Sequence, residues 1–141
     1  MRPDLLMGVL VLSTLNLVAC SPNLPRAIEL CEIGDRREQF AGQKLIVEGE
    51  LLVSKHGSAV VDSNCDIGLP ISWRDEKGEF ESFNAIAMRM RGEPGDWHTK
   101  VRVSGEMKRA RRSEFLDEPY WYLNLESARV VSTANTRADA E

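Results

Sequence analysis

Apolar and polar residues alternate along several segments of the chain, which is the period-two pattern of strands that bury one face. The longest of these segments starts at residue 44 and ends at a turn formed by His56 and Gly57. Its inward positions share one face, and they are Leu45, Val47, Leu51 and Val53, with Gly49 among them. Shorter segments of the same kind complete a prediction of five strands, and they cover residues 58–64, 67–73, 99–110 and 120–132.

Three positions within these strands predict local irregularities. Gly49 lies in the middle of the first strand, where a glycine usually marks a bend or a close approach of backbone. Pro70 has no N–H to give to a ladder, so the third strand is expected to lie at an edge or a bulge. In the last strand the inward set shifts phase between Leu125 and Ala128, which predicts a β-bulge near Glu126.

Two segments have apolar residues at helical spacing instead. Residues 26–33 are predicted to form a short N-terminal helix, followed by one more turn that ends at Gly42. A longer helix is predicted over residues 80–92, with Gly92 and Pro94 ending it. Its apolar side is formed by Phe80, Phe83, Ala87 and Met90.

The order of these elements predicts a mainly β fold. Three strands, a helix and two more strands resemble the OB-fold, a five-stranded Greek-key barrel, here with an additional short N-terminal helix. The sequence pattern Val-x-Gly-Glu occurs at residues 47–50 and again at 103–106, as expected for two coiled strands of one barrel. The resemblance to small OB-like periplasmic lipoproteins covers residues 26–132 and carries no activity with it, and residues 133–141 are expected to form a flexible tail. The alternative is an α+β sandwich with an open sheet.

The N-terminal region carries a second motif. Residues 5–19 are mostly apolar and uncharged, too short for a transmembrane helix, and they end in Leu17, Val18, Ala19 and Cys20. This ending resembles the lipobox of bacterial lipoproteins. The resemblance implies a signal peptide over residues 1–19, acylation of Cys20 and a lipidated tether over residues 20–25. Ser21, by the sorting rule of that family, implies the periplasmic face of the outer membrane. The alternative is an uncleaved membrane helix with a chance cysteine.

The cysteine count agrees with export. Of three cysteines, removal of Cys20 by lipidation leaves Cys31 and Cys65, an even pair in an oxidising compartment. We therefore predict a disulfide between them, the alternative being two separate buried thiols. A thiol-redox role is disfavoured because the chain has no Cys-x-x-Cys pair.

The distribution of charge along the chain is more informative than the net charge. The 141 residues carry a net charge of −4, which excludes a globally basic nucleic-acid binder. One segment, however, gathers cations and aromatic rings in the predicted connection between the last two strands. We predict a ligand-binding edge there, formed by Lys108, Arg109, Arg111, Arg112, Tyr120 and Tyr122. Such a surface suits an anionic envelope component or an envelope protein, and the alternative is a solvated hairpin.

Other chemistry has little support in the sequence. His56 and His98 are far apart and lie outside any ligand-spaced motif, so we predict no metal and no cofactor. The serines lack a Gly-x-Ser-x-Gly context, and no glycine-rich loop would cradle a phosphate. These patterns favour a membrane-anchored, non-catalytic binding or adaptor module. The alternative is an envelope enzyme with an active site that the sequence does not reveal.

Overall fold

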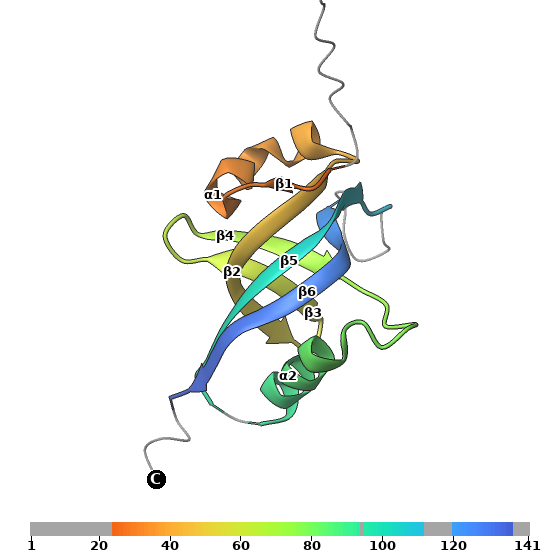
Figure 1. The fold of residues 1–141 in the computed structure, drawn as a ribbon. Helices are drawn as coiled ribbons and strands as arrows, with labels where there is room; N and C mark the ends of the chain where they lie inside the picture. Colours follow the sequence, from red (N-terminus) through yellow and green to blue (C-terminus); the bar gives the residue numbers. More distant parts are fainter. Residues whose placement is uncertain (1–23, 94, 112–119, 137–141) are drawn as a thin grey trace, which may run out of the picture.

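The five predicted strands are all present in the computed structural model, which describes residues 24–93, 95–111 and 120–136 (Figure 1). They are β2 (Lys44–Ser54), β3 (Gly57–Asp62), β4 (Ile67–Ser72), β5 (Trp97–Arg109) and β6 (Trp121–Asn135). The strand β6 continues three residues past its expected end, because Asn135 still pairs with Trp97. The longer helix, α2 (Glu81–Gly92), also lies where its apolar spacing places it.

The N-terminal segment differs from the expected helix over residues 26–33. Its first two residues form a short strand, β1 (Arg26–Ala27), which pairs in parallel with β2, and Ile28 N–H donates to Ile46 O at 3.0 Å. Only the next residues are helical, as α1 (Leu30–Ile33) and then the 3₁₀ helix η1 (Gly34–Phe40). The physical reason is that the edge of β2 offers free N–H and C=O groups to residues 26–28. The spacing of apolar residues within the segment carries no information about such a distant partner.

The strands form one mixed sheet that curls into a partly closed ring. Its order is β1-β2-β3-β4-β6-β5, and β2 also pairs with β5, so the long strand β2 serves both sides (Figure 1). The weakest contact of the ring lies between β4 and β6, where only Ile71 and Ser72 have parallel partners, Leu123 and Asn124. The prediction of a mainly β, barrel-like fold is thus confirmed.

The core fills the inside of this ring. The inward residues of the strands are almost fully buried, including Leu45, Val47, Val101, Val103 and Met107. The two α-helices lie at opposite ends of the sheet in Figure 1. The N-terminal segment contributes Leu30, Ile33 and Phe40 to the core, and α2 with its preceding residue contributes Phe80, Phe83 and Ala87. In the part of the chain that the structure describes, no helix has the length and apolar character needed to cross a bilayer.

The three irregular positions behave as the sequence predicts. A Cβ added at Gly49 would lie 2.7 Å from Val60 Cγ1 and 2.8 Å from Leu30 Cδ1, so backbone and side chains approach closely there. Glu126 has no partner in the ladder between β5 and β6, as expected for a bulge there, and a second register shift, which the sequence did not indicate, leaves Val131 without a ladder partner. Pro70 pairs with β3 only, since the β4–β6 pairing starts one residue later, so it lies at an open edge.

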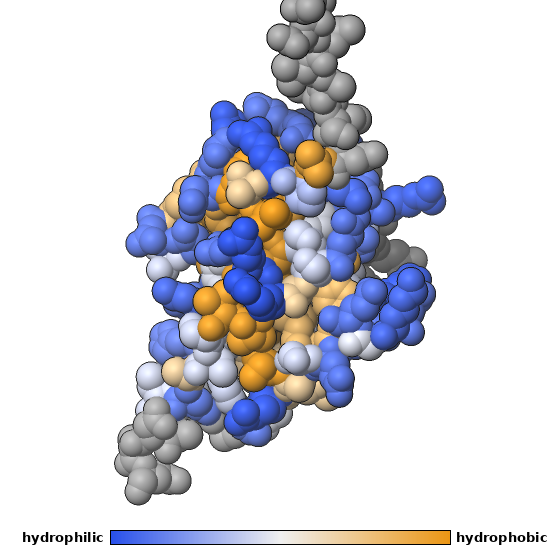
Figure 2. Space-filling view, viewed as in Figure 1, coloured by the Kyte–Doolittle hydropathy of each residue, from blue (hydrophilic) through white to orange (hydrophobic). Residues whose placement is uncertain are grey.

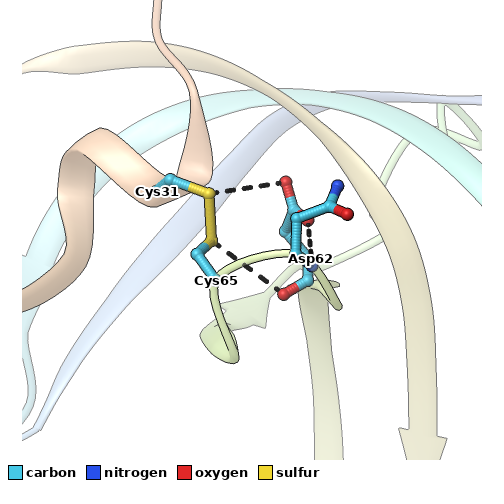
Figure 3. The surroundings of a disulfide bond; sticks show 4 residues. Cys31, Asp62 and Cys65 are labelled. Atoms are coloured by element: carbon cyan, nitrogen blue, oxygen red, sulfur yellow. Dashed lines mark hydrogen bonds between the residues drawn. A yellow bond between two sulfur atoms is a disulfide. The ribbon is translucent and has the colours of Figure 1, made fainter.

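The predicted disulfide is confirmed. Cys31 in α1 is bonded to Cys65 in the β3–β4 turn, and their Cα atoms lie 5.6 Å apart (Figure 3). The bond joins the N-terminal segment to a hairpin that lies 34 residues later in the sequence. It therefore ties α1 to the barrel covalently, in addition to the buried side chains of that helix.

Candidate functional site

A surface groove of about 820 Å³ lies beside the end of the β5–β6 hairpin. Three segments that are distant in sequence line it: the β2–β3 turn, the end of β4 and the residues on either side of the β5–β6 connection. Its lining residues are His56, Gly57, Ser58, Pro70, Ile71, Ser72, Ala110, Arg111, Tyr120 and Tyr122. The groove thus lies between the β2–β3 turn and the open end of the β5–β6 hairpin, next to the short pairing of β4 with β6.

Strand pairing explains why these segments meet. The β5–β6 ladder ends with Arg109 opposite Trp121, and Ala110 N–H then donates to Tyr120 O at 2.9 Å. Arg111 and Tyr120 are therefore held at the mouth of the hairpin. The parallel pairing of Ile71 with β6 brings the end of β4 alongside Tyr122.

Two tyrosines form the aromatic wall of the groove. Tyr120 and Tyr122 are two residues apart, and their ring centroids lie 6.0 Å apart with the planes tilted by 47°. Tyr120 is 41% exposed, so a substantial part of its side chain is open to solvent. Aromatic faces of this kind stack on rings of sugars or bases, and their hydroxyl groups add hydrogen-bonding capacity.

The groove has a cationic character among the residues that the structure describes. Arg111 lines it and is exposed, and none of the lining residues within the described part of the chain is an aspartate or a glutamate. Arg111 also has no ion-pair partner within residues 24–93, 95–111 and 120–136. An exposed cation next to an aromatic wall is suited to a ligand that carries both an anion and a ring.

The predicted site residues do not all meet in this groove. Lys108 lies outside it and its Nζ is 3.5 Å from Glu106 Oε2. The guanidinium of Arg109 lies 5.9 Å from the ring centre of Trp121, also outside the lining. Arg112 lies outside the described residues. Alternation along β5 accounts for Arg109, which is opposite Trp121 in the ladder, but not for Lys108, which is opposite Tyr122 and is nevertheless absent from the lining.

His56 and Pro70 line the groove although sequence reasoning did not place them there. His56 lies in a turn and Pro70 in a strand edge, and neither is near the aromatic segment in sequence. Their only signal in the sequence is the strand order, which in an OB-like barrel brings the first hairpin next to the last one.

A different face of the molecule mixes apolar and charged side chains (Figure 2). Among the exposed large apolar residues of the strands are Leu52 in β2 and Val131 in β6, each more than half exposed. Glu48 accepts from Arg102 at 2.7 Å, and Glu50 lies 3.8 Å from His98. Arg102 and His98 thus each lie beside a carboxylate, which an anionic ligand would have to displace. Arg111 has no such neighbour among the described residues, so the groove is the stronger candidate for an anionic ligand.

Comparison with known proteins does not assign the chain to a family. The sequence matches no protein-family model, and a search of curated proteins returned no significant match.

Proposed function

We propose that this protein is a lipid-anchored binding module of the cell envelope, which holds an anionic envelope component in the groove beside Tyr120. The observation that carries the proposal is the joint placement of Arg111, Tyr120 and Tyr122 in one groove whose described lining has no carboxylate. A non-catalytic binding or adaptor role suits this arrangement, because it supplies a ring surface and a cation.

The proposal includes an OB-fold for the barrel. Its support is the ring order β2-β3-β4-β6-β5, the second pairing of β2 with β5, and the helix α2, which lies between β4 and β5 in the chain. In OB-folds the ligand face lies between the first hairpin loop and the loop before the last strand. The β2–β3 turn and the described residues on either side of the β5–β6 connection, Ala110, Arg111 and Tyr120, line the groove, and this supports the same ligand face here.

The groove is tested by vesicle co-sedimentation with the chain lacking residues 1–20, which retains every described element. The probes are anionic phospholipid vesicles and, separately, lipopolysaccharide. Reversing Arg111 to glutamate removes one attraction of about 1 kcal/mol and adds a repulsion of similar size, so affinity should fall roughly 30-fold. Binding by the unaltered domain should also weaken as salt rises, because exposed charges are screened over about 8 Å at physiological ionic strength.

The matched control is Arg91→Glu, which reverses an exposed arginine in α2, outside the groove lining. It changes the net charge equally and should leave affinity nearly unchanged. Tyr120→Leu separates the two probes, since a stacked sugar ring loses its partner whereas a bare headgroup does not. If Arg111→Glu and Arg91→Glu lowered the affinity equally, the proposal that the groove binds the anionic component would be wrong. The same conclusion would follow if the unaltered domain bound neither probe at low salt.

The anchor is tested independently of the groove. We propose that Cys20 is the acylated first residue of the mature protein and that the barrel is held at the periplasmic face of the outer membrane. Leu24, the first described residue, is 75% exposed, and only three residues separate it from Cys20. Mass spectrometry of the membrane-extracted protein should find a triacylated Cys20 at the N-terminus. A chain that begins at Met1, or an unmodified Cys20, would contradict the proposal.

A further inference from the structure

A second cluster of chemically active side chains lies at the disulfide. Cys31, Asp62 and Cys65 come from α1, from the end of β3 and from the β3–β4 turn, and they face one another in Figure 3. One ligand atom from each residue lies within 4.8 Å of the other two. Within residues 24–93, 95–111 and 120–136 this is the one group of three histidine, cysteine or acidic side chains that meets this condition.

The carboxylate of Asp62 is held in place with one oxygen turned to the sulfur atoms. Its Oδ1 accepts from Asn64 N–H at 2.8 Å, which fixes the orientation of the side chain. Its Oδ2 lies 3.8 Å from Cys31 Sγ. A disulfide sulfur has no proton to donate, so in the oxidised protein this contact is not a hydrogen bond. Asp62 Oδ2 therefore faces the sulfur atoms without receiving a hydrogen bond from them.

Contacts other than the disulfide also hold the two cysteines in place. Leu30 and Ile33 flank Cys31 and are fully buried, so their packing holds α1 against the barrel. Arg37 Nη2 also donates to Gly68 O at 2.9 Å, which joins the following turn of helix to β4. The other cysteine is held by the β3–β4 ladder. Reduction should therefore leave both thiols close to Asp62.

We propose that reduction of the Cys31–Cys65 disulfide converts this cluster into a zinc site. A dithiol reductant gives two electrons and two protons to the disulfide and is itself oxidised to a disulfide. Zn²⁺ then binds the two sulfur atoms as thiolates, with release of two protons, and Asp62 Oδ2 becomes the third ligand.

The geometry suits this metal. In a tetrahedral zinc site with Zn–S of about 2.3 Å and Zn–O of about 2.1 Å, the two sulfurs lie about 3.8 Å apart and each lies about 3.6 Å from the oxygen. The present Cys31 Sγ–Asp62 Oδ2 distance of 3.8 Å is close to that value. Once the bond is broken, side-chain rotation can separate the sulfurs. Cys31 is exposed, and Asp62 also lines a surface depression of about 300 Å³, so water can take the fourth position.

The test is a Zn²⁺ titration of the full-length protein by calorimetry, before and after reduction with a phosphine that has no thiol. The reduced protein should bind one Zn²⁺ per chain and release two protons, and the oxidised protein should not bind at this site. Asp62→Asn removes the carboxylate but keeps an oxygen for Asn64 N–H. It should weaken binding by about tenfold or more.

The matched control is Asp66→Asn in the same turn, where the backbone φ of 52° suits asparagine as well as aspartate. It should bind zinc as the unaltered protein does. The proposal is overturned if Asp62→Asn and Asp66→Asn bind equally well, or if oxidised and reduced proteins bind alike. It is also overturned if the reduced, metal-free protein loses its far-ultraviolet circular dichroism, because the site requires α1 in its folded position.

Discussion

Replacing Phe83 with alanine is expected to lower the free energy of unfolding by about 3–5 kcal/mol. Phe83 is 1% exposed and is the largest fully buried side chain among the described residues. Its ring meets Trp73 edge-on, with centroids 4.9 Å apart. Trp73 Nε1–H donates to Asn84 Oδ1 at 2.6 Å, so the aromatic pair is also linked to α2 through its polar groups. The substitution would leave a cavity where the Phe83 ring now packs against Trp73.

The effect is measured by urea unfolding at equilibrium, with Met88→Ala as the control. Met88 lies on the same helix and is 65% exposed, so its truncation should change stability by less than about 0.5 kcal/mol. Similar midpoints for the two variants would contradict the burial of Phe83 in the core.

Removing the disulfide is expected to cost about 3–4 kcal/mol in the chain-entropy model. The bond closes a loop between positions 34 residues apart, and the unfolded chain without it gains the freedom of that loop. The double variant Cys31→Ser, Cys65→Ser should still fold, because Leu30 and Ile33 remain buried against the barrel. Its unfolding midpoint in urea should fall, and its denaturant slope should rise, since the unfolded chain exposes more surface.

Reduction of the unaltered protein is the control for the serine substitutions themselves. The reduced protein and the double variant should unfold at similar urea concentrations, because both lack the covalent link. If the oxidised protein and the double variant had the same midpoint, the bond would contribute nothing to stability. The packing of α1 alone would then hold the N-terminal segment to the sheet.

The disulfide also has a consequence for the proposed anchor. The bond lies in α1, close in sequence to the tether that would lead to Cys20. Together with the β1–β2 pairing and the burial of Leu30, it fastens the first described residues to the barrel. With the proposed anchor at Cys20, a barrel fastened so close to that residue would remain at the membrane surface, where anionic lipid headgroups lie.

Several features of the fold could be read directly from the sequence. Period-two alternation located all five main strands, and the phase shift near Glu126 located the bulge, because both depend only on which residues face the core. Parity of the cysteines predicted the Cys31–Cys65 bond without any knowledge of distance. Gly49 was recognisable as a point of close approach because a glycine in a strand interior is otherwise unfavourable.

The repeated Val-x-Gly-Glu pattern is visible in the sequence, but its structural meaning is not. In the β2–β5 ladder Val47 pairs with Val103, while Gly49 pairs with Val101 and Gly105 with Leu45. A Cβ at Gly105 would collide with the carbonyl oxygen of Asn124. The sequence indicated that the two segments are alike, but only the paired strands explain the likeness, since each glycine lies opposite a buried residue of the other strand.

The N-terminal segment and the groove required the tertiary structure. Helical spacing over residues 26–33 was outweighed by two residues of parallel pairing with β2, a long-range contact that no local pattern encodes. The groove joins His56, Pro70 and Arg111, which are distant in sequence and meet only because β4 and β6 are neighbours. The alternation of apolar residues depends on which face each residue presents to the core, and the cysteine pairing followed from a count. Both can therefore be read from the sequence without knowing which strands are neighbours. Which strands become neighbours depends on the free energy of the whole barrel, and that decides which side chains share a site.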